Sequence, residues 1–574
     1  MGYAHEYAAA VMRRGRVPME PADFVPNWAD RPRKGKYFPG AERLPLPDGT
    51  AAPDADVQRG LFGPRGQGEF TLPLLGGMLR DSYGLTGRRL AVQANSDLGS
   101  LPFYTHANFS RGTASGGGLY PIGIHWVCGP SGPFTPGVYH YATGHHAMER
   151  LLTGDVSAEV RAALGPAPHE GQGKHQEQEQ DQEQKQKQPD WETDQFLVLG
   201  VKFWQNAFKY NSFSYHVVAM DIGALLETWR IWARAHGLHI GAALWFDEPR
   251  LTGLLGMAPE EEGVFAVVPL RWHQDGTAGA RPGSAPAGVR VRAVDQERSR
   301  TVLDFETVQS VHAATLAGAT ERPAPGLLAG ALADALTDAL TDAPAGGEQP
   351  PGGAPAGADL QLPAPQPLTT GVRTALRARR SSFGRFTAEP PMSAVQLATA
   401  LAAASTTARL DTDAETGTAA HPDGPPLTRL YVFVNHVAGI APGSYAYLPH
   451  GERAALRPLG SGTPGAFLQR TYFLANYNLE QAGAVIAVAA PTAAVLDAVG
   501  DRGLRLVNAA VGACSQALYT ATAAAGLACG VALGFDCVSY AEELGLAERG
   551  EVPMLIMMVG QEHRSPADFD HRIA

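Results

Sequence analysis

The feature that most constrains this 574-residue chain is an internal repeat that pairs its front half with its back half. PGVYHY at 136–141 returns as PGSYAY at 442–447, an offset of 442 − 136 = 306. HGLHIGAALWFD at 236–247 returns as AGLACGVALGFD at 525–536, an offset of 525 − 236 = 289. A third pair, LGMA and LGLA, keeps the offset of 289. Three pairings in one order predict two tandem copies of one domain.

Two low-complexity segments divide the chain. Residues 171–190 are polar and of mixed charge, so they have nothing to bury and are expected to form a solvated insertion. This insertion explains most of the fall in offset, 306 − 289 = 17. Residues 318–368, rich in Pro, Gly and Ala, are typical of a linker. We therefore expect an N-terminal domain at 1–317 and a C-terminal domain at 369–574.

Each copy repeats the same order of predicted elements. A Gly-bearing loop is followed by a strand, a PGxYxY turn with its own strand, a third strand, a long apolar helix and a last strand. The third strands are FLVLGVKF and AVIAVAAP, and the last strands are GVFAVVPL and VPMLIMMVG. Strands interleaved with long helices in this way predict a layered α+β domain.

The composition excludes several classes of protein. The net charge of 46 − 57 = −11 argues against a nucleic-acid-binding face, and a hydrophobic content of 44% indicates a large buried core. The four cysteines have no metal-ligand spacing, so neither a metal site nor a disulfide framework is expected. The first residues lack the apolar core of a secretory signal, and polar residues interrupt the most apolar stretches. These features predict a cytoplasmic protein without a membrane span.

A basic motif opens the second copy. In RRSSFGRF, Arg379 and Arg380 supply guanidiniums and Ser381 a hydroxyl, which are charge-assisted donors suited to a phosphate monoester. Arg564 follows the last strand and is expected to join the same phosphate. The alternative interpretation is a solvated basic turn.

A glycine-rich loop precedes the first strand of the first copy. It contains Ser115, Gly116 and Gly117 within RGTASGGGLYP. Consecutive glycines let a backbone pass close to a flat ligand, with its polar groups free to bond the ligand's edge. The alternative is a flexible turn. A dinucleotide-binding loop is excluded because that motif follows a strand and opens a helix.

Taken in order, these segments resemble a known family. RRSSFGRF, the SGGGLYP loop, the PGxYxY hairpin and FWQNAFKYNSFSY together resemble the nitroreductase fold, and within it the SagB-type, thiazole- or oxazole-forming dehydrogenases. The resemblance covers most of residues 1–270 and 370–570. It implies an FMN enzyme in which the flavin lies between two protomers. One protomer grips the phosphate and places a Gly-bearing loop over the ring, while the other supplies a Ser/Gly loop.

The resemblance assigns roles to individual residues of both copies. It implies that Arg379, Arg380, Ser381 and Arg564 bind the phosphate and that Leu533 and Gly534 form the loop over the ring. It further implies that Asn478 and Gln481 contact the pyrimidine edge and that Ser115, Gly116 and Gly117 form the loop from the partner copy. The first copy lacks the RRS motif and has Trp245 where the second has Gly534. The second copy has HPDGPP where the SGGG loop is expected. We therefore predict an α+β intramolecular pseudo-dimer of two tandem nitroreductase-like domains with one intact FMN site.

A Lys-Tyr pair is the expected catalytic element. Lys209 and Tyr210 resemble the pair implicated in catalysis in the SagB-type branch, and the second copy has Gly500 and Asp501 near that position. Converting an azoline to an azole removes one C–H hydrogen as a proton and another as a hydride. Either side chain is able to take the proton, and the sequence does not decide between them. Without the resemblance, a surface cation and a packed aromatic would be the simpler interpretation.

The expected function is therefore an FMN-dependent dehydrogenase that oxidises thiazolines or oxazolines in a ribosomally synthesised peptide. Its expected partners are that peptide and a cyclodehydratase complex that presents it. Two alternatives stay open. One is another FMN oxidoreductase of the nitroreductase type, active in NAD(P)H-driven reduction or in peptide desaturation. The other is a flavin-less docking scaffold.

Overall fold

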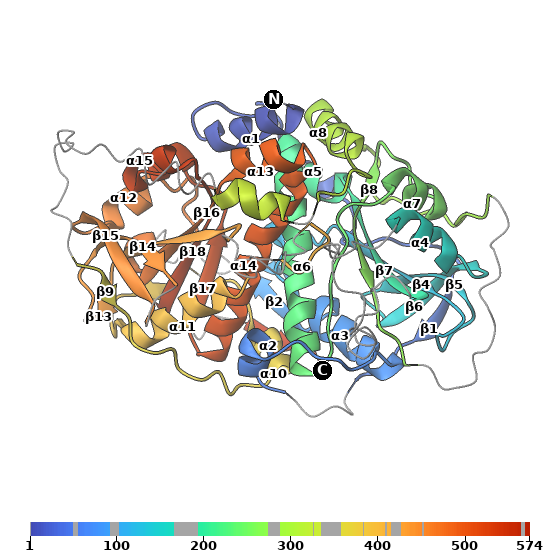
Figure 1. Ribbon diagram of the computed structural model, residues 1–574, viewed down its shortest axis with the longest axis horizontal. Helices are drawn as coiled ribbons and strands as arrows, with labels where there is room; N and C mark the ends of the chain where they lie inside the picture. The colour runs from blue at the N-terminus through green and yellow to red at the C-terminus, as the bar shows by residue number, and fades with distance from the viewer. Residues whose placement is uncertain are drawn as a thin grey trace, which may run out of the picture.

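Two sheets lie on either side of a central pair of long helices in the computed structural model (Figure 1). The structure describes residues 2–49, 55–91, 103–165, 193–273, 288–324, 326–333, 358–382, 384–407, 410–414, 426–449, 453–563 and 569–573. The insertion expected at 171–190 and most of the linker expected at 318–368 lie outside these ranges. Strand β9 (Leu360–Gln361) lies inside the expected linker and pairs with the second sheet.

The two sheets have matching strand orders. In the front half, the order is β1 (Glu42–Pro45), β6 (Ala147–Thr153), β5 (Gly137–Ala142), β4 (Ile122–Cys128), β7 (Gln195–Lys202) and β8 (Glu262–Pro269). In the back half, it is β9, β15 (Ala455–Ser461), β14 (Gly443–Leu448), β12 (Arg429–Val434), β16 (Ala484–Ala490) and β18 (Val552–Glu562). Two further strands, β10 (Phe386–Thr387) and β17 (Ala528–Ala532), pair with β18. The matching strand orders confirm the predicted tandem of two α+β domains.

The repeated PGxYxY segments also share their local geometry. The register of β5 against β6 shifts between Val138 and Tyr139, and that of β14 against β15 shifts between Ser444 and Tyr445. Each of these tyrosines donates its hydroxyl to the carbonyl four residues upstream. The same bulge and the same hydrogen bond therefore recur at equivalent positions of the two copies.

Helices α6 (Ser214–Ala235) and α14 (Gly503–Ala524) cross at the centre of the molecule (Figure 1). A side chain at Gly223 would collide with the carbonyl of Ala509, and one at Gly512 would collide with the carbonyl of Met220. The two contacts are equivalent because 509 − 220 = 512 − 223 = 289, the offset of the repeat. Such reciprocity is the geometry of two-fold related partners, and the two glycines set how closely the helices approach.

The remaining helices surround this core. Helices α2 and α10 pack against α6 and α14, respectively, and α7 and α15 precede the last long strand of each sheet, β8 and β18. The bounds are α2 (Val57–Phe62), α3 (Leu72–Tyr83), α4 (Ser157–Leu164), α5 (Trp204–Tyr210), α7 (Glu248–Leu254), α8 (Glu306–Ala317), α10 (Val372–Ala378), α11 (Ala394–Ser405), α12 (Gly465–Arg470), α13 (Thr492–Val499) and α15 (Cys537–Leu544). No described helix is both long and apolar enough to cross a membrane.

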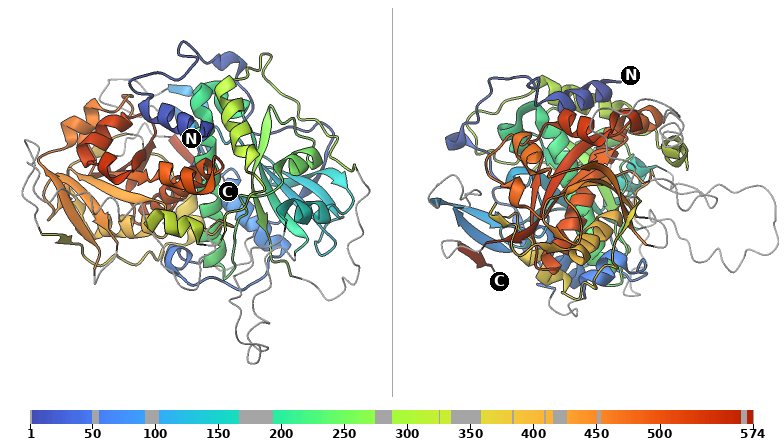
Figure 2. Two further views of the ribbon diagram at one scale, coloured as in Figure 1. Left: turned by 45° about the horizontal axis from the view of Figure 1, so that its top comes forward. Right: turned by 90° about the vertical axis from the view of Figure 1, so that its left-hand side faces the viewer.

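The two ends of the chain each reach across to the other half. Helix α1 (Tyr3–Arg13) packs against α8 of the front half and against α13 and α15 of the back half. Near the other terminus, β19 (Phe569–Arg572) pairs with the front-half hairpin of β2 (Gly87–Ala91) and β3 (Phe103–Ser110), as Figure 2 shows. These exchanged ends tie the halves together outside the central helices.

Candidate functional site

The glycine-rich loop of the front half is held by both central helices. The Ser115 hydroxyl donates to the Asp221 carboxylate at 2.6 Å, and the Gly116 amide donates to it at 2.8 Å. The preceding Ala114 amide donates to Gln516 on α14 at 2.9 Å. Desolvation raises the pKa of the buried Asp221 to about 7, although the bonds from Ser115 and Gly116 oppose it. The loop is therefore fixed at the junction of the halves.

Gly117 of this loop lies against the predicted catalytic pair. Its φ of 62° is left-handed, and a Cβ atom there would lie 2.6 Å from the Tyr210 hydroxyl and 2.8 Å from Lys209 Nζ. Only glycine combines this conformation with this closeness. Lys209 Nζ also lies 4.8 Å from the centre of the Tyr210 ring. The structure therefore brings together the SGGG loop and the Lys-Tyr pair, which are about ninety residues apart in sequence.

The Leu533–Gly534 loop of the back half lies at the same junction. Its two carbonyls accept hydrogen bonds, that of Leu533 from Arg14 on the segment after α1 and that of Gly534 from the Phe473 amide. Among the residues that the structure describes, no acceptor bonds the amides of Leu533 and Gly534. Tyr472 pairs with Phe535, and its pKa is raised mainly by burial, with a contribution from the nearby Tyr210. Arg14, which bonds the Leu533 carbonyl, also lies 4.6 Å from the centre of the Phe213 ring, three residues after Tyr210, so the loop and the Lys-Tyr pair are linked through one side chain.

The equivalent loop of the front half is closed by the protein itself. The amides of Leu244 and Trp245 both donate to the Asp413 carboxylate, at 2.8 and 3.1 Å. Arg322 donates to the same carboxylate at 3.2 Å, and the Trp245 side chain is almost fully buried. The amides of Leu244 and Trp245 are therefore bonded by a carboxylate, whereas no described residue bonds the equivalent amides of Leu533 and Gly534.

The side chains of the RRSS motif bond groups of the protein itself, whereas the sequence pattern predicted side chains open to a phosphate. Arg379 donates to the carbonyls of Gly112 and Arg111, both at 2.7 Å, and so holds the chain that leads into the SGGG loop. It is 5% exposed, and no carboxylate of the described residues pairs with it. The Ser381 hydroxyl lies 3.0 Å from that of Tyr519. Arg379 is therefore a buried cation that contacts two carbonyls and the Tyr519 ring, 5.2 Å from its centre, without a carboxylate partner among the described residues.

Glu562 takes donors that the sequence pattern predicted for a phosphate. Arg380 pairs with Glu562 at 3.0 Å, and the Ser382 hydroxyl donates to the same carboxylate at 2.6 Å. Gln481 accepts from the Ala388 amide, and Asn478 precedes the short helix that contains Gln481. Arg564 lies outside the described residues. The partners of Arg380 and Gln481 named here thus belong to the back half, whereas Arg379 donates to carbonyls of the front half.

Comparison with known proteins identifies the back half. Residues 376–561 match the model of the nitroreductase family. The back half contains a nitroreductase-family domain. No curated protein matches the sequence.

Solved structures extend the likeness to the whole chain. A protein from Anabaena variabilis that is described as a nitroreductase matches 98% of this chain and 100% of its own, with 19% identity and a TM-score of 0.66. This match spans both halves and shows a shared fold. A Ralstonia eutropha protein with the same description covers 39% of this chain and 98% of its own, with 21% identity and a TM-score of 0.28. The E. coli microcin synthetase McbBCD complex with truncated pro-MccB17 covers 42% and 77%, with 17% identity and a TM-score of 0.24.

The residues at the junction of the nitroreductase-family domain fit the FMN that the resemblance implies. Ser381 pairs with Cys529 on β17, and that strand leads to Gly534. The five steps along the chain from Cys529 to Gly534 span at most about 16 Å at about 3.3 Å per residue. At one end lie Arg379, without a carboxylate partner among the described residues, and two hydroxyls, which suit an anion. At the other end lie open backbone amides, which suit the polar edge of a flat ring.

Several residues that shape this nitroreductase-like site escaped the sequence analysis. Asp221 is a single acid within the apolar run HVVAMDIGALL, and this interruption is a signal that would have found it. Arg14, Asp413 and Glu562 give no comparable signal, because their partners lie 519, 169 and 180 residues away in the chain. Only the folded chain brings these pairs together.

Proposed function

We propose that this protein is an FMN-dependent dehydrogenase that oxidises an azoline in a ribosomally made peptide to an azole. Its two halves act as an intramolecular pseudo-dimer with one flavin site. The observation that carries the proposal is the packing of Lys209 and Tyr210 against Gly117. The amides of Leu533 and Gly534, which no described residue bonds, supply the second element of the proposed site. In the proposed complex, the Lys-Tyr pair would supply a proton acceptor close to the flavin ring.

The flavin would be held by both halves. Arg379 and Ser381 would bind the phosphate, the Leu533 and Gly534 amides would bond the ring edge, and the Ser115–Gly117 loop would cover the ring from the front half. Bound FMN supplies the hydride acceptor for the oxidation. The Asp413 carboxylate and the Trp245 indole would exclude a second flavin from the equivalent place in the front half.

The chain's own contribution to the chemistry is position and proton transfer. Lys209 Nζ and the Tyr210 hydroxyl both lie beside Gly117, so a substrate ring lying on that loop would have its C–H bond within reach of one of them. The left-handed turn at Asn211 ends α5 directly after this pair, and Asn211 donates to the Pro21 carbonyl. The N-terminal segment thereby fixes the end of the catalytic helix. Whether lysine or tyrosine takes the proton is the question that mutagenesis decides.

The first experiment is an absorption spectrum with a flavin-to-protein ratio. We expect a yellow protein with one FMN per chain, and two FMN per chain would refute the single-site proposal. The second is turnover of a synthetic thiazoline peptide under air, with loss of two hydrogens measured by mass spectrometry. Rapid reduction of the flavin by NAD(P)H, without oxidation of the peptide, would favour a reductase. A colourless protein that binds the peptide would favour a docking scaffold.

The catalytic pair is tested by Lys209→Ala and Tyr210→Phe at equal flavin content. We expect one of the two changes to lower turnover by at least about a hundredfold, as for removal of a general base, and the other to have a smaller effect. Unchanged turnover in both variants would remove the pair from the mechanism.

A further inference from the structure

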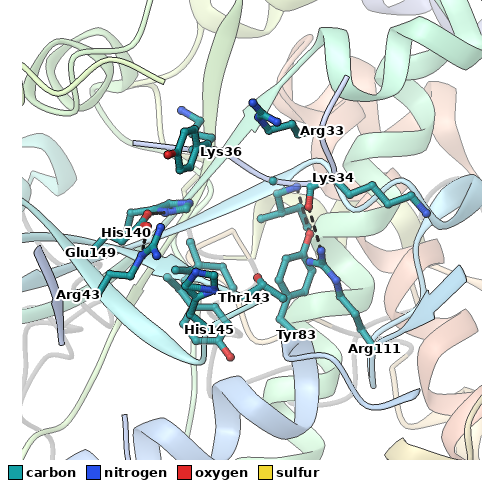
Figure 3. Close-up of a pocket in the computed structure, with 17 residues that line it drawn as sticks. Arg33, Lys34, Lys36, Arg43, Tyr83, Arg111, His140, Thr143, His145 and Glu149 are labelled. Atoms are coloured by element: carbon teal, nitrogen blue, oxygen red, sulfur yellow. Dashed lines mark hydrogen bonds and ion pairs between the residues drawn. The ribbon is translucent and has the colours of Figure 1, made fainter. Parts of the chain in front are cut away.

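The front half contains a cavity of about 210 Å³ whose lining is strongly basic (Figure 3). It lies between residues 33–37, the strands β4 and β5, and Tyr83 at the end of α3. These elements all belong to the front half, whereas Arg379, Ser381 and Gly534 belong to the back half. The cavity shares no lining residue with the groups proposed to hold the flavin, although the carbonyl of Arg111 accepts a hydrogen bond from Arg379.

Some of the basic groups in this cavity are neutralised by acids. Lys36 pairs with Glu262, while Arg43 at 2.9 Å and His140 at 3.3 Å both contact Glu149. Two guanidiniums remain. Among the described residues, no carboxylate pairs with Arg33 or with Arg111. The cavity therefore has an excess of positive charge.

Arg111 is the better-defined of these two cations. It is 4% exposed, and its guanidinium lies between the rings of Tyr83 and Tyr120, 4.3 and 4.2 Å from their centres. One of its terminal nitrogens donates to the Lys34 carbonyl at 3.1 Å. Its Nε atom is buried without a hydrogen-bond partner. An unmet charged donor of this kind is costly, so the geometry calls for an acceptor supplied by a ligand.

The cavity is connected with the catalytic region through Lys34. The backbone of Lys34 lines the cavity, but in Figure 3 its side chain leads away from His140 and Glu149. Desolvation, together with repulsion from Arg111, Arg31 and Lys209, lowers the pKa of the Lys34 ammonium to about 8. Lys34 therefore lies close enough to Arg111 and Lys209 for their charges to disfavour its own.

We propose that this cavity binds a carboxylate of the peptide substrate, so that the enzyme prefers an azoline near an acidic side chain. Arg33 and Arg111 would both donate to this carboxylate, since planar guanidiniums match its geometry. The identity of the ligand as part of a substrate rests on the proposed function. The presence of a carboxylate site does not.

Binding is tested on the full-length, flavin-loaded protein with matched probes. The probes are a glutamate and a glutamine, each blocked at both ends, so that they differ only in the side-chain carboxylate. Inorganic phosphate at the same ionic strength is the third probe. We expect the blocked glutamate to raise Tm saturably, and the blocked glutamine and phosphate to have no such effect. Equal effects of glutamate and glutamine would overturn the proposal, and so would stabilisation by phosphate alone.

Variants locate the binding to the cavity. We expect Arg111→Gln and Arg33→Gln to weaken glutamate binding at least about tenfold, the usual scale for loss of a charge-assisted hydrogen bond. Arg298→Gln, which removes an exposed positive charge outside the cavity, should leave it unchanged. Because Arg111 is buried, its change has the larger risk of unfolding, and the partly exposed Arg33 then decides. Equal losses in all three variants would indicate a general charge effect and overturn the site.

Turnover separates this proposal from the proposed function. Two thiazoline peptides that differ only in a neighbouring Glu or Gln are compared, and we expect a lower KM, by about tenfold, for the Glu peptide. Arg33→Gln should abolish the preference without changing kcat. If neither peptide is oxidised while the blocked glutamate still binds, the proposed function fails and the carboxylate site stands. If both are oxidised with equal KM, the substrate preference fails and the proposed function stands.

Discussion

The equivalent loops Leu244–Trp245 and Leu533–Gly534 show how two copies of one fold come to differ. The carbonyls of both loops accept from an arginine: that of Leu244 from Arg502 at 2.6 Å, and that of Leu533 from Arg14. The amides differ, because Asp413 bonds those of the front loop and no described residue bonds those of the back loop. Both loops thus keep an arginine bonded to a carbonyl. They differ in whether their amides are free to bond a ligand.

The largest effect is expected from a change in the buried ion pairs that join the two halves. Glu248 is fully buried and pairs with Arg502 at 3.0 Å and Arg505 at 2.8 Å, across the junction. Burial alone would raise the pKa of Glu248, but the two guanidiniums hold it below its usual value. We expect Glu248→Gln to lower the free energy of unfolding by about 3–5 kcal/mol, since it leaves buried cations unpaired.

This loss is measured by urea denaturation with Glu260→Gln as the control. Glu260 is exposed and follows α7, so its change should stay within about 0.5 kcal/mol of the wild type. A Glu248→Gln protein as stable as the control would show that the pair of arginines finds other compensation.

The second change transfers the front-half residue to the back half. Gly534→Trp copies Trp245 and places an indole where the flavin ring is proposed to lie. A Cβ atom at Gly534 meets nothing closer than Leu474 Cγ at 3.6 Å, so Gly534→Ala is sterically tolerated and serves as the matched control. We expect FMN content to fall from one per chain to nearly none in Gly534→Trp and to be retained in Gly534→Ala. Full flavin content in the tryptophan variant would contradict the assignment of this loop.

The reverse change sharpens the same point. Trp245→Gly removes a buried indole and should cost about 3–5 kcal/mol in unfolding free energy. It should nevertheless not create a second flavin site, because Asp413 still bonds both amides. A flavin-to-protein ratio above one in this variant would show that the indole alone closes the front half.

A smaller effect is expected from the arginine that contacts both sides of the candidate site. The Arg14 guanidinium donates to the Leu533 carbonyl and lies 4.6 Å from the centre of the Phe213 ring, three residues after Tyr210. Arg14→Gln should lower kcat by about tenfold, a barrier change of roughly 1.4 kcal/mol, with flavin content retained. Arg13→Gln is the control because Arg13 is exposed on the same turn. Recovery of kcat in Arg14→Lys would indicate that charge at this position suffices, and an unchanged kcat in Arg14→Gln would exclude a positioning role.

Local patterns in the sequence predicted the repeat, and the family resemblance pointed separately to Gly117 and to the pair Lys209 and Tyr210. Their mutual contact is a finding of the structure. The PGxYxY segments were informative because the bulge and its tyrosine hydrogen bond are formed within a few residues. The RRSS motif was less so. Its residues are donors, as predicted, but Arg379 turns to two backbone carbonyls, and which acceptor it meets depends on how the front half packs. The hydrogen bonds from the Leu244 and Trp245 amides to Asp413 could not be predicted from the sequence for the same reason.

A further prediction concerns pH and the loop at Gly116. In the unfolded chain the Asp221 carboxyl loses its proton near its ordinary pKa of 3.8, whereas in the folded protein, where burial raises its pKa, it keeps the proton up to about 7. Between these values the folded state binds more protons, so this group's contribution to the free energy of unfolding falls as pH rises, and it is constant above about 7.

Asp221→Asn removes this titration while keeping the shape of the side chain. The difference in unfolding free energy between wild type and variant should therefore fall by about 1.4 kcal/mol per pH unit within this window, in favour of the variant. Denaturation at several pH values between 4 and 8 measures this difference, and the exposed Asp304→Asn should show no such slope. Parallel stability curves for wild type and Asp221→Asn would mean that Asp221 is ionised throughout. The Ser115 and Gly116 donors would then outweigh its burial, and the SGGG loop would be held by a charge at every pH at which the protein folds.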